Sequence, residues 1–316
     1  MNLNIHNADA KKVVTLIVPV FNEEESIQSF CKAVATLSLE HYEFDILFID
    51  DGSQDRTVDV IKSLQKTNPH IHLISFIRNF GKEAALFAGL TEAKGDAVIP
   101  MDVDLQDPIE VVPEFIKEWE KGADVVLGKR RRRHGDSLIK RLSAAIFYKL
   151  HNKICSVQIK QDVGDFRLIS AELVPNITNL RERNLFMKGL LNFAGGKEAI
   201  VEYDRPARLH GDASQSPIKL LRLALNGIFG YSTVPLRLST YFGVLSAGVS
   251  FCYALYALFE TFIKKHKLSG SPLLLTIVLF LGGVQLISIG LLGEYIGRMY
   301  IEIKDRPRYL LKRDNT

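Results

Sequence analysis

The fold of this chain is decided by one stretch, VIPMDVDLQDP at residues 98–108. An apolar run typical of a buried strand ends there in Asp102 and Asp104, one residue apart. Alternate residues of an extended segment point the same way, so both carboxylates can face one spot beyond the strand's carboxyl end, where open α/β sheets bind ligands. A divalent cation held by oxygen ligands would relieve their repulsion, and a solvated acidic turn closed by Pro108 explains the stretch equally well.

The residues on either side repeat one theme: an apolar run, a polar turn and an amphipathic stretch. Apolar runs predict strands at 13–20, 44–49, 71–76, 97–101 and 124–127. Helical spacing of apolar residues predicts helices at 26–37, 57–64, 82–93 and 111–121. Strands that alternate with helices predict a mostly parallel sheet covered on both faces. Neither the dinucleotide fingerprint G-x-G-x-x-G nor a Walker loop occurs, so we expect a nucleotide-type sheet without either phosphate cradle.

Two further polar turns allow a plain and a functional interpretation. The turn DDGSQD at 50–55 is explained in part by a helix cap from Ser53 or Asp55, although two acids at a strand end also suit a ribose hydroxyl or a base N–H. The segment DVGDFRL at 162–168 places an aromatic between an acid and a base in a short turn. It is either a salt-bridged loop or a carboxylate for a reacting centre beside a guanidinium for a phosphate.

The second half of the chain carries the membrane signals. Residues 217–225 predict a basic amphipathic helix on a membrane surface, with an ordinary core helix as the competing interpretation. Residues 241–259 and 273–293 contain no charge, and each approaches the roughly 20 residues needed to cross a bilayer. With the basic loop 264–272 between them they predict a transmembrane hairpin. The basic tail favours the cytoplasm for the catalytic domain and the C-terminus, against three lysines in the loop.

Composition limits the function classes. The 316 residues are 47% hydrophobic, enough for a substantial core and more than one unit. Lys and Arg number 40 against 36 Asp and Glu, too small an excess to indicate nucleic acid. The basic run 129–133 has no interleaved aromatics and suits a membrane-bound phosphate acceptor better. Three widely spaced cysteines indicate neither a disulfide frame nor a zinc site, and no cleaved signal peptide is expected at residues 1–12.

Four motifs follow one another in the first half: VPVFNEE at 18–24, DDGS at 50–53, NFGK at 79–82 and DVDLQDP at 102–108. Together they resemble the inverting family 2 glycosyltransferases with a GT-A fold. Four later motifs are GDFRL at 164–168, ERNLFMKG at 182–189, FLGGVQLI at 280–287 and GEYIGR at 293–298. These resemble the polyprenyl-phosphate glycosyltransferases, with the closest likeness to the bactoprenol (undecaprenyl-phosphate) glucosyltransferases and a more distant one to dolichol-phosphate mannose synthases. The resemblance covers residues 13–310.

The resemblance implies a role for each matching residue. The residues that would hold the nucleotide base and ribose are Pro19, Phe21, Glu23, Ile49 and Asp51. Further nucleotide-sugar ligands would be Lys82, Asp102, Arg130 and Arg208, with Arg130 near the nucleotide diphosphate or the acceptor phosphate. The ligands of Mg²⁺ or Mn²⁺ would be Asp102, Asp104 and Gln106. Catalysis would rest on Asp165, which matches a position that the family needs for activity, together with Arg167 and Asp104.

The activity implied is inverting transfer of a sugar to undecaprenyl (polyprenyl) phosphate in the bacterial inner membrane. UDP-glucose is the donor that the resemblance favours, and UDP-N-acetylglucosamine and a modified UDP-arabinose stay open. The product would serve O-antigen or other cell-envelope glycan modification. The implied partners are the bilayer, further copies of the chain in a tetramer, and a downstream flippase and glycosyltransferase, but no nucleic acid.

The expected organisation has five parts. These are a tail at 1–12, a GT-A catalytic domain at 13–213, a juxtamembrane amphipathic region at 214–236, a two-span transmembrane hairpin at 237–297 and a basic cytoplasmic tail at 298–316. One departure from the family is Ser214, where relatives usually carry a lysine shortly after the glycine of an R-x-x-G segment. The candidates to replace that cationic phosphate contact are His210 and Lys219.

Two rival interpretations fit the sequence less well. A processive polysaccharide synthase needs a Q-x-x-R-W motif, and the single tryptophan, Trp119, lies instead in EWE at 118–120. A non-catalytic membrane scaffold would not need the intact set of Asp102, Asp104, Gln106, Asp165 and Arg167.

Overall fold

The structure, a computed structural model, describes residues 11–131, 148–149, 151–155, 158, 160–183, 185–193, 195–204, 228–263 and 271–312. The strands are β1 (Lys12–Val20), β2 (Tyr42–Asp50), β3 (Ile71–Ser75), β4 (Ala97–Pro100), β5 (Val125–Arg130), β6 (Val163–Ser170) and β7 (Glu198–Tyr203). The helices are α1 (Ile27–Val34), α2 (Thr57–Gln65), α3 (Lys82–Glu92), η1 (Ile109–Val111), α4 (Val112–Glu120), α6 (Val174–Thr178), α7 (Met187–Phe193), α9 (Val234–Ile263) and α10 (Ser271–Ile303).

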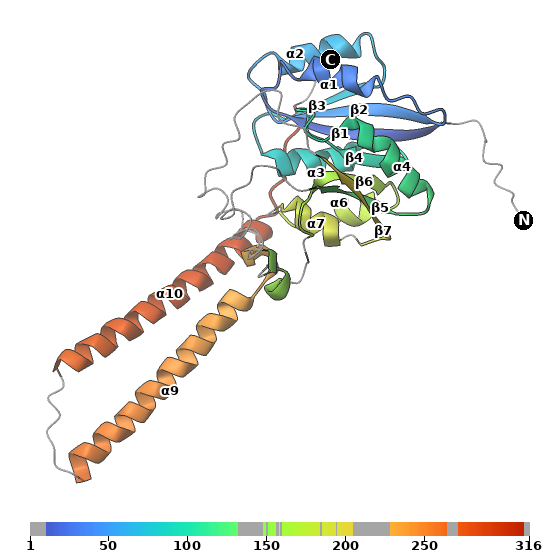
Figure 1. Ribbon diagram of the computed structural model, residues 1–316. Helices are drawn as coiled ribbons and strands as arrows, with labels where there is room; N and C mark the ends of the chain where they lie inside the picture. The colour runs from blue at the N-terminus through green and yellow to red at the C-terminus, as the bar shows by residue number, and fades with distance from the viewer. Residues whose placement is uncertain are drawn as a thin grey trace, which may run out of the picture.

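The strands form one sheet in the order β3-β2-β1-β4-β6-β5-β7 (Figure 1). Its β3-β2-β1-β4 half is parallel throughout, and β7 is parallel to β5. Only β6 runs against its neighbours β4 and β5. The predicted mostly parallel α/β sheet is therefore confirmed, with one antiparallel strand near its middle.

Both faces of the sheet are covered, as the sequence predicts. In β1, Leu16 and Val18 face a core shared with α1, α2 and α4, whereas Ile17 faces a second core shared with α3, α6 and α7. Helix α3 is buried from Ala84 to Leu90 and fills the centre of that second core. Burial of a strand on both faces explains why its sequence is continuously apolar rather than alternating.

The predicted turn at 162–168 is wrong, because these residues form strand β6. On one face of β6, Phe166 packs against Phe115 of α4 and Tyr203 of β7, with ring centroids 4.6 and 5.4 Å apart. The other face of β6 carries Asp165 and Arg167, followed by the apolar Ile169. Charged residues at two inward positions hide the alternation by which a strand is predicted.

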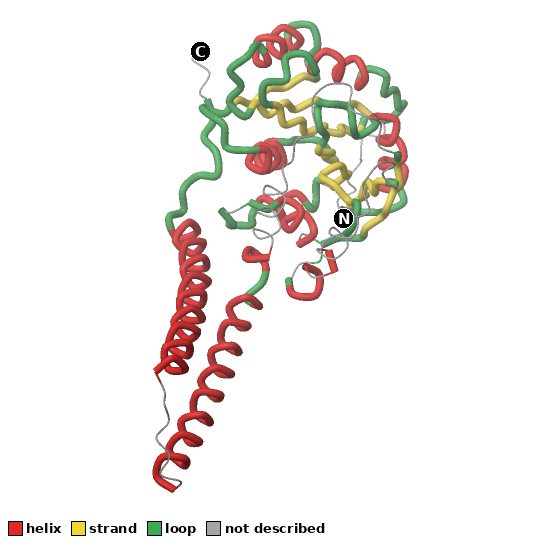
Figure 2. The backbone as a smooth tube through the Cα atoms, turned by 60° about the vertical axis from the view of Figure 1, so that its left-hand side comes forward, coloured by secondary structure: helices red, strands yellow, loops and turns green. Residues whose placement is uncertain are grey.

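Helices α9 and α10 run side by side away from the sheet in both views (Figures 1 and 2). Their apolar side chains face outward: Tyr241 is 68% exposed and Leu286 is 72% exposed. Within the described residues, one helical segment, Phe280–Ile303, is long and apolar enough to cross a membrane by length and composition. Helix α10 also continues past 297, the predicted end of the hairpin.

The tail after α10 returns to the sheet, which its basic composition did not predict. Leu311 forms an antiparallel bridge with Phe76 at the end of β3, and the backbone N–H of Lys312 donates to Ser75 at 2.7 Å. The ring of Tyr309 stacks on Phe76 with centroids 5.0 Å apart. The tail is thus bound to the edge of the sheet farthest from β7.

Several predictions lie outside the described residues. They concern Arg208 and the segment 208–214, the amphipathic helix at 217–225 and the loop that joins α9 to α10.

Candidate active site

Most of the predicted site residues come together in a pocket of about 350 Å³ at the carboxyl ends of the parallel strands. The parallel register places Val20 of β1 beside Asp50 of β2, and β4 ends next to β1. Because β6 is antiparallel, it brings its first residues, including Asp165, to the same edge. The predicted residues that line the pocket are Pro19, Phe21, Glu23, Asp51, Lys82, Asp102 and Asp104.

The loops after β1 and β2 are fixed to each other at the nucleotide end of the pocket. Asn22 has a left-handed backbone (φ 54°), and its side chain accepts a hydrogen bond from the Gln54 N–H at 2.9 Å. The Glu23 N–H donates to the Thr57 hydroxyl at 2.8 Å. Phe21 is left 43% exposed at the mouth, where its ring face can stack on a base.

Asp51 organises the loop that follows β3. Its two carboxylate oxygens accept the backbone N–H groups of Phe80 and Gly81 at 2.6 and 2.8 Å. Burial raises the pKa of Asp51, and these two N–H groups oppose that shift. Gly52 lies at φ +75° against the Arg78 backbone, where a Cβ would come within 2.6 Å of a carbonyl carbon. The cap interpretation of this turn is right for Asp55, which accepts from the Thr57 N–H at the start of α2.

Ile49, predicted to contact the nucleotide, does not line the pocket. Its side chain is fully buried in the core between β2 and α3. Position 49 belongs to the scaffold under Asp51, because strand residues alternate between the two faces of a sheet.

Lys82 links two carboxylates across the pocket. Its Nζ lies 2.5 Å from Asp102 and 3.4 Å from Asp165. Burial works against the charge of Lys82, but the two carboxylates outweigh it and raise the pKa of the amine. Burial likewise opposes ionisation of Asp165, but Lys82, Lys188 and Arg167 outweigh it and lower the pKa of this carboxyl. Asp165 is therefore held as a carboxylate.

The acids after β4 suit a hard divalent cation. Asp102 and Asp104 both line the pocket, whereas Gln106 is buried and does not. Among the described residues, no three His, Cys, Asp or Glu side chains lie close enough to hold a metal on their own. Mg²⁺ in phosphate sites is often bound by one or two carboxylates, with the remaining ligands from phosphates and water. Asp102 and Asp104 fit that pattern, and the Lys82 amine shows that a cation is accommodated at Asp102.

Arg130 reaches the same edge of the sheet from β5. Its Nε donates to the Tyr203 hydroxyl at 3.3 Å, and that hydroxyl donates to Asp107 at 2.7 Å. The guanidinium lies over Gly164, where a Cβ would meet its Nη2 at 2.9 Å. Arg130 is thus held against Gly164, the residue before Asp165, and its predicted contact with a phosphate stays a prediction.

Arg167 does not reach a phosphate from where it lies, contrary to the prediction. The guanidinium is only 2% exposed, between β6 and α7, and does not line the pocket. Its Nη2 donates to the Gly164 carbonyl at 2.8 Å and its Nη1 donates to Asn192 at 3.4 Å. Burial lowers its pKa to about 10, partly offset by Asp165. Arg167 acts as a buried positive charge behind Asp165.

The structure also brings in two residues to which the sequence assigned no role, Glu83 and Lys188. A Glu83 oxygen accepts the Met187 N–H at 2.5 Å, which ties the start of α3 to the start of α7. Burial, reinforced by Asp165, raises the pKa of Glu83 to about 7. Lys188 lies near Asp165, Arg130 and Glu83. Their signal in the sequence was a charge within an otherwise apolar helix start, in GKEAALF and NLFMKG.

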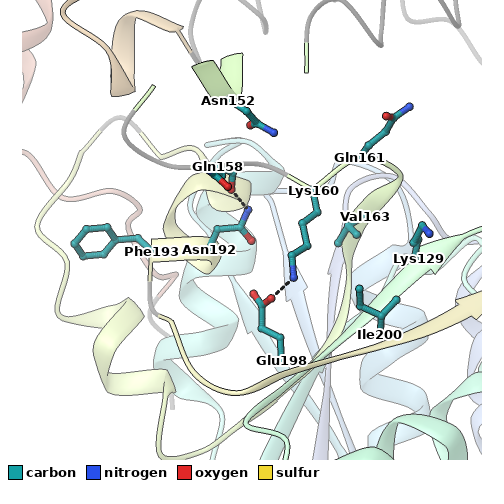
Figure 3. A pocket seen from close by; sticks show the side chains of 10 residues that line it. All are labelled: Lys129, Asn152, Gln158, Lys160, Gln161, Val163, Asn192, Phe193, Glu198 and Ile200. Carbon is teal, nitrogen blue, oxygen red and sulfur yellow. Dashed lines mark hydrogen bonds and ion pairs between the residues drawn. The ribbon is translucent and has the colours of Figure 1, made fainter. Parts of the chain in front are cut away.

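A second, larger cavity of about 630 Å³ lies among the ends of β5, β6, β7 and α7 (Figure 3). None of the predicted site residues lines it. Its charged groups are already paired, Lys160 with Glu198 and Lys129 with Glu202. Its size therefore does not make it the reaction site, and the smaller pocket is the candidate active site.

Comparison with known proteins agrees with this geometry. The model of the family described as "Glycosyl transferase family 2" matches residues 15–178, and "GtrB C-terminal hairpin" matches residues 234–299. A "Prophage bactoprenol glucosyl transferase homolog" of Escherichia coli (strain K12) is 54% identical over 95% of this chain and 98% of its own. The "SfII prophage-derived bactoprenol glucosyl transferase" of Shigella flexneri is 53% identical over 96% of this chain and 98% of its own.

Among solved structures, glucosyl-3-phosphoglycerate synthase from Mycobacterium tuberculosis is similar at 20% identity and a TM-score of 0.46. The likeness covers 69% of this chain and 78% of that one. The family match and the two full-length relatives are decisive: this chain belongs to glycosyl transferase family 2.

Proposed function

We propose that this protein transfers glucose from UDP-glucose to undecaprenyl phosphate, with inversion at the anomeric carbon. The observation that carries the proposal is the meeting of Asp102 and Asp165 at Lys82, beside a pocket that Phe21 and Glu23 also line. A leaving diphosphate needs positive charge, and a sugar carbon that becomes oxocarbenium-like needs a carboxylate nearby. Lys82 supplies the positive charge, and Asp165 supplies the carboxylate 3.4 Å from the Lys82 amine. The names of the two relatives support the choice of substrates.

The donor is proposed to lie along the parallel half of the sheet. The base would stack on Phe21, the ribose would face Glu23, and the diphosphate would lie against Lys82. A divalent cation on Asp102 and Asp104 would add positive charge against the leaving diphosphate. Lys82 would then turn from Asp102 towards the phosphates, a movement that its 45% exposed side chain permits.

The reaction breaks the bond between the sugar's anomeric carbon and the donor phosphate, and UDP leaves with the electron pair. An oxygen of the acceptor phosphate forms the new bond from the opposite face. That oxygen is already anionic near neutral pH, so no strong base is required. The lowered pKa of Asp165 supports a role as an ionised stabiliser of the oxocarbenium-like carbon, with Arg167 as the buried charge that keeps it so.

We further propose that α9 and α10 cross the bacterial inner membrane as two spans. The outward-facing apolar side chains of both helices and the hairpin family match support this arrangement. The tail bound beside β3 supports a topology with the chain end and the catalytic domain on one side of the membrane, and the basic residues favour the cytoplasm for that side. The lipid-linked sugar would then be passed to a flippase and a second transferase for O-antigen or envelope glycan modification, and the tetramer stays a prediction.

The test is transfer by the full-length protein in nanodiscs containing undecaprenyl phosphate. Radiolabelled UDP-glucose, UDP-N-acetylglucosamine and a modified UDP-arabinose are offered in parallel, with discs lacking the lipid phosphate as the control. We expect a lipid-soluble, mild-acid-labile product from UDP-glucose only. A different preferred donor would correct the sugar, and no product from any donor would favour the non-catalytic scaffold.

A further inference from the structure

Lys188 is a cation near the proposed reaction centre whose ammonium is bound by no residue that the structure describes. Four cationic side chains lie in this region: Lys82, Arg167 and Lys188 act on Asp165, and Arg130 lies against the neighbouring Gly164. Lys82 is paired with Asp102 and Asp165, Arg130 bonds Tyr203, and Arg167 is enclosed by Gly164 and Asn192. Within the part of the chain that the structure describes, Lys188 alone of the four makes no hydrogen bond or ion pair within 4 Å.

Lys188 is also held firmly in place. It is the second residue of α7, and the N–H of the first, Met187, is bonded by Glu83 at 2.5 Å. The next residue, Gly189, lies directly under the ring of Tyr231, where a Cβ would come within 2.6 Å of the ring. Only glycine allows this approach, so the backbone on both sides of Lys188 is fixed by packing. A lysine without a hydrogen bond or close ion pair on such a rigid support can take up a ligand, because Asp165 and Glu83 attract its partly buried ammonium only at longer range.

The position of Lys188 favours the acceptor over the donor. Lys188 does not line the pocket that holds Phe21, Glu23 and Asp102. Its helix α7 packs towards the long helices: Gly189 lies against Tyr231, which precedes α9 by three residues and whose hydroxyl donates to Glu182 at 3.2 Å. The N–H of Arg183 donates to Glu302 near the end of α10 at 2.9 Å. α7 therefore borders the side of the site from which a lipid would arrive.

We propose that Lys188 binds the phosphate of the lipid acceptor and brings its attacking oxygen to the side of Asp165 opposite the donor. This inference rests on the proposed function, since it names the ligand of the same site. One ammonium with its three N–H groups supplies a point charge to a phosphate without fixing its orientation. The repulsion between Asp165 and the incoming phosphate is thereby offset by a cation that the donor does not use.

The test compares Lys188→Met and Lys188→Arg with wild type in the nanodisc assay. For Lys188→Met we expect the apparent KM for undecaprenyl phosphate to rise roughly tenfold or more, as for loss of a charged hydrogen bond. The KM for UDP-glucose and the affinity for UDP should stay within about twofold of wild type, and Lys188→Arg should recover most of the acceptor affinity. The matched control is Lys121→Met, which removes an exposed lysine at the end of α4 and should change neither constant.

Other outcomes overturn the proposal. A fall in kcat with the acceptor KM unchanged would make Lys188 a mere counter-charge to Asp165, and an equal rise in the UDP-glucose KM would assign it to the donor. Thermal unfolding of each variant checks that α7 is intact, and loss of folding in both variants would show a structural role.

The binding role of Lys188 can also be tested if the proposed function is wrong. If wild type transfers no sugar, retention of radiolabelled undecaprenyl phosphate by the immobilised protein still measures the site. Lys188→Met should then retain about tenfold less lipid than wild type and Lys121→Met. Equal retention by all three proteins would overturn the assignment of Lys188.

Discussion

The two halves of the sheet carry the two halves of the proposed reaction and are built by different rules. In the parallel half, β3-β2-β1-β4, the strand interiors are apolar apart from Thr15, and the buried carboxylates Asp50 and Asp51 stand where β2 ends. In the mixed half, β6-β5-β7, a charged group enters the interior of a strand itself: Arg167 of β6 is 2% exposed. In the proposed function the first half would bind the soluble donor at its rim, and the second holds charge inside a strand.

Because of this difference, we expect substitutions in the two halves to affect different kinetic constants. A solvated charge adds little to stability, whereas a buried charge is costly and must be offset by its neighbours. Arg167 and Asp165 offset each other two residues apart on β6, and Lys82 spans from the first half to join them. Changes in the parallel half should therefore affect donor affinity, and changes in the mixed half should affect turnover.

The largest expected effect is that of removing the proposed metal, which would act where the two halves meet. EDTA should lower transfer by roughly a thousandfold, because the diphosphate would lose the cation on Asp102 and Asp104 during departure. Added Mg²⁺ or Mn²⁺ should restore it. Transfer is measured in the nanodisc assay, with Zn-EDTA as a control for the chelator itself. Full activity in EDTA would remove the metal from the mechanism and leave Lys82 as the cation for the diphosphate.

Asp165→Asn removes the carboxylate charge of β6 in the mixed half. We expect kcat to fall by about a hundredfold, because the amide cannot stabilise positive charge at the anomeric carbon, while UDP binding stays near wild type. Stopped assays give kcat, and calorimetry with UDP gives the affinity. Asp162→Asn makes the same chemical change at an exposed position three residues earlier and should be neutral. Unchanged turnover in Asp165→Asn would take this residue out of the site.

The parallel half could be predicted from the sequence, since its strands are the apolar runs and its site residues follow them directly. The predicted strand at 13–20 differs from β1 by one residue, and the one at 97–101 differs from β4 by one. Lys82 was predicted as a ligand because NFGK matches the family, although only the fold shows that it reaches Asp165.

The mixed half could not be predicted in the same way. In β6 the inward Asp165 and Arg167 disguise a strand as a turn, and in β7 the outward Glu198 and Glu202 leave too few apolar residues for a strand to be recognised. Burial of Arg167 depends on Asn192 and Gly164, partners that spacing along the chain does not reveal. The return of Tyr309 to Phe76 is a contact across more than 200 residues, for which no local pattern exists.

Phe21→Ala tests which cavity receives the donor. Loss of base stacking should raise the KM for UDP-glucose about fivefold to tenfold with little change in kcat. The control is Phe193→Ala, because Phe193 is also an exposed ring, but it borders the larger cavity (Figure 3). Steady-state kinetics at saturating lipid give both constants. A donor KM that responds to Phe193 and not to Phe21 would move the donor to the larger cavity and reverse the roles of the two halves.

The smallest expected effect is on thermal stability and concerns Glu83, whose pKa is raised by burial and by the nearby Asp165. Its pKa is about 7 in the folded protein against 4.5 for an ordinary glutamate, so between these values the folded chain holds a proton that the unfolded chain releases. Stability from this group is complete below pH 4.5 and is lost as the pH rises through about 7. The Tm of wild type should fall by a few degrees more than that of Glu83→Gln between pH 5 and 7.5, roughly the shift that one such group allows. Glu114→Gln, on the exposed face of α4, should follow wild type. Parallel curves for wild type and Glu83→Gln would mean that Lys82 and Lys188 outweigh burial and leave Glu83 ionised, so that the site would hold one more negative charge than we infer.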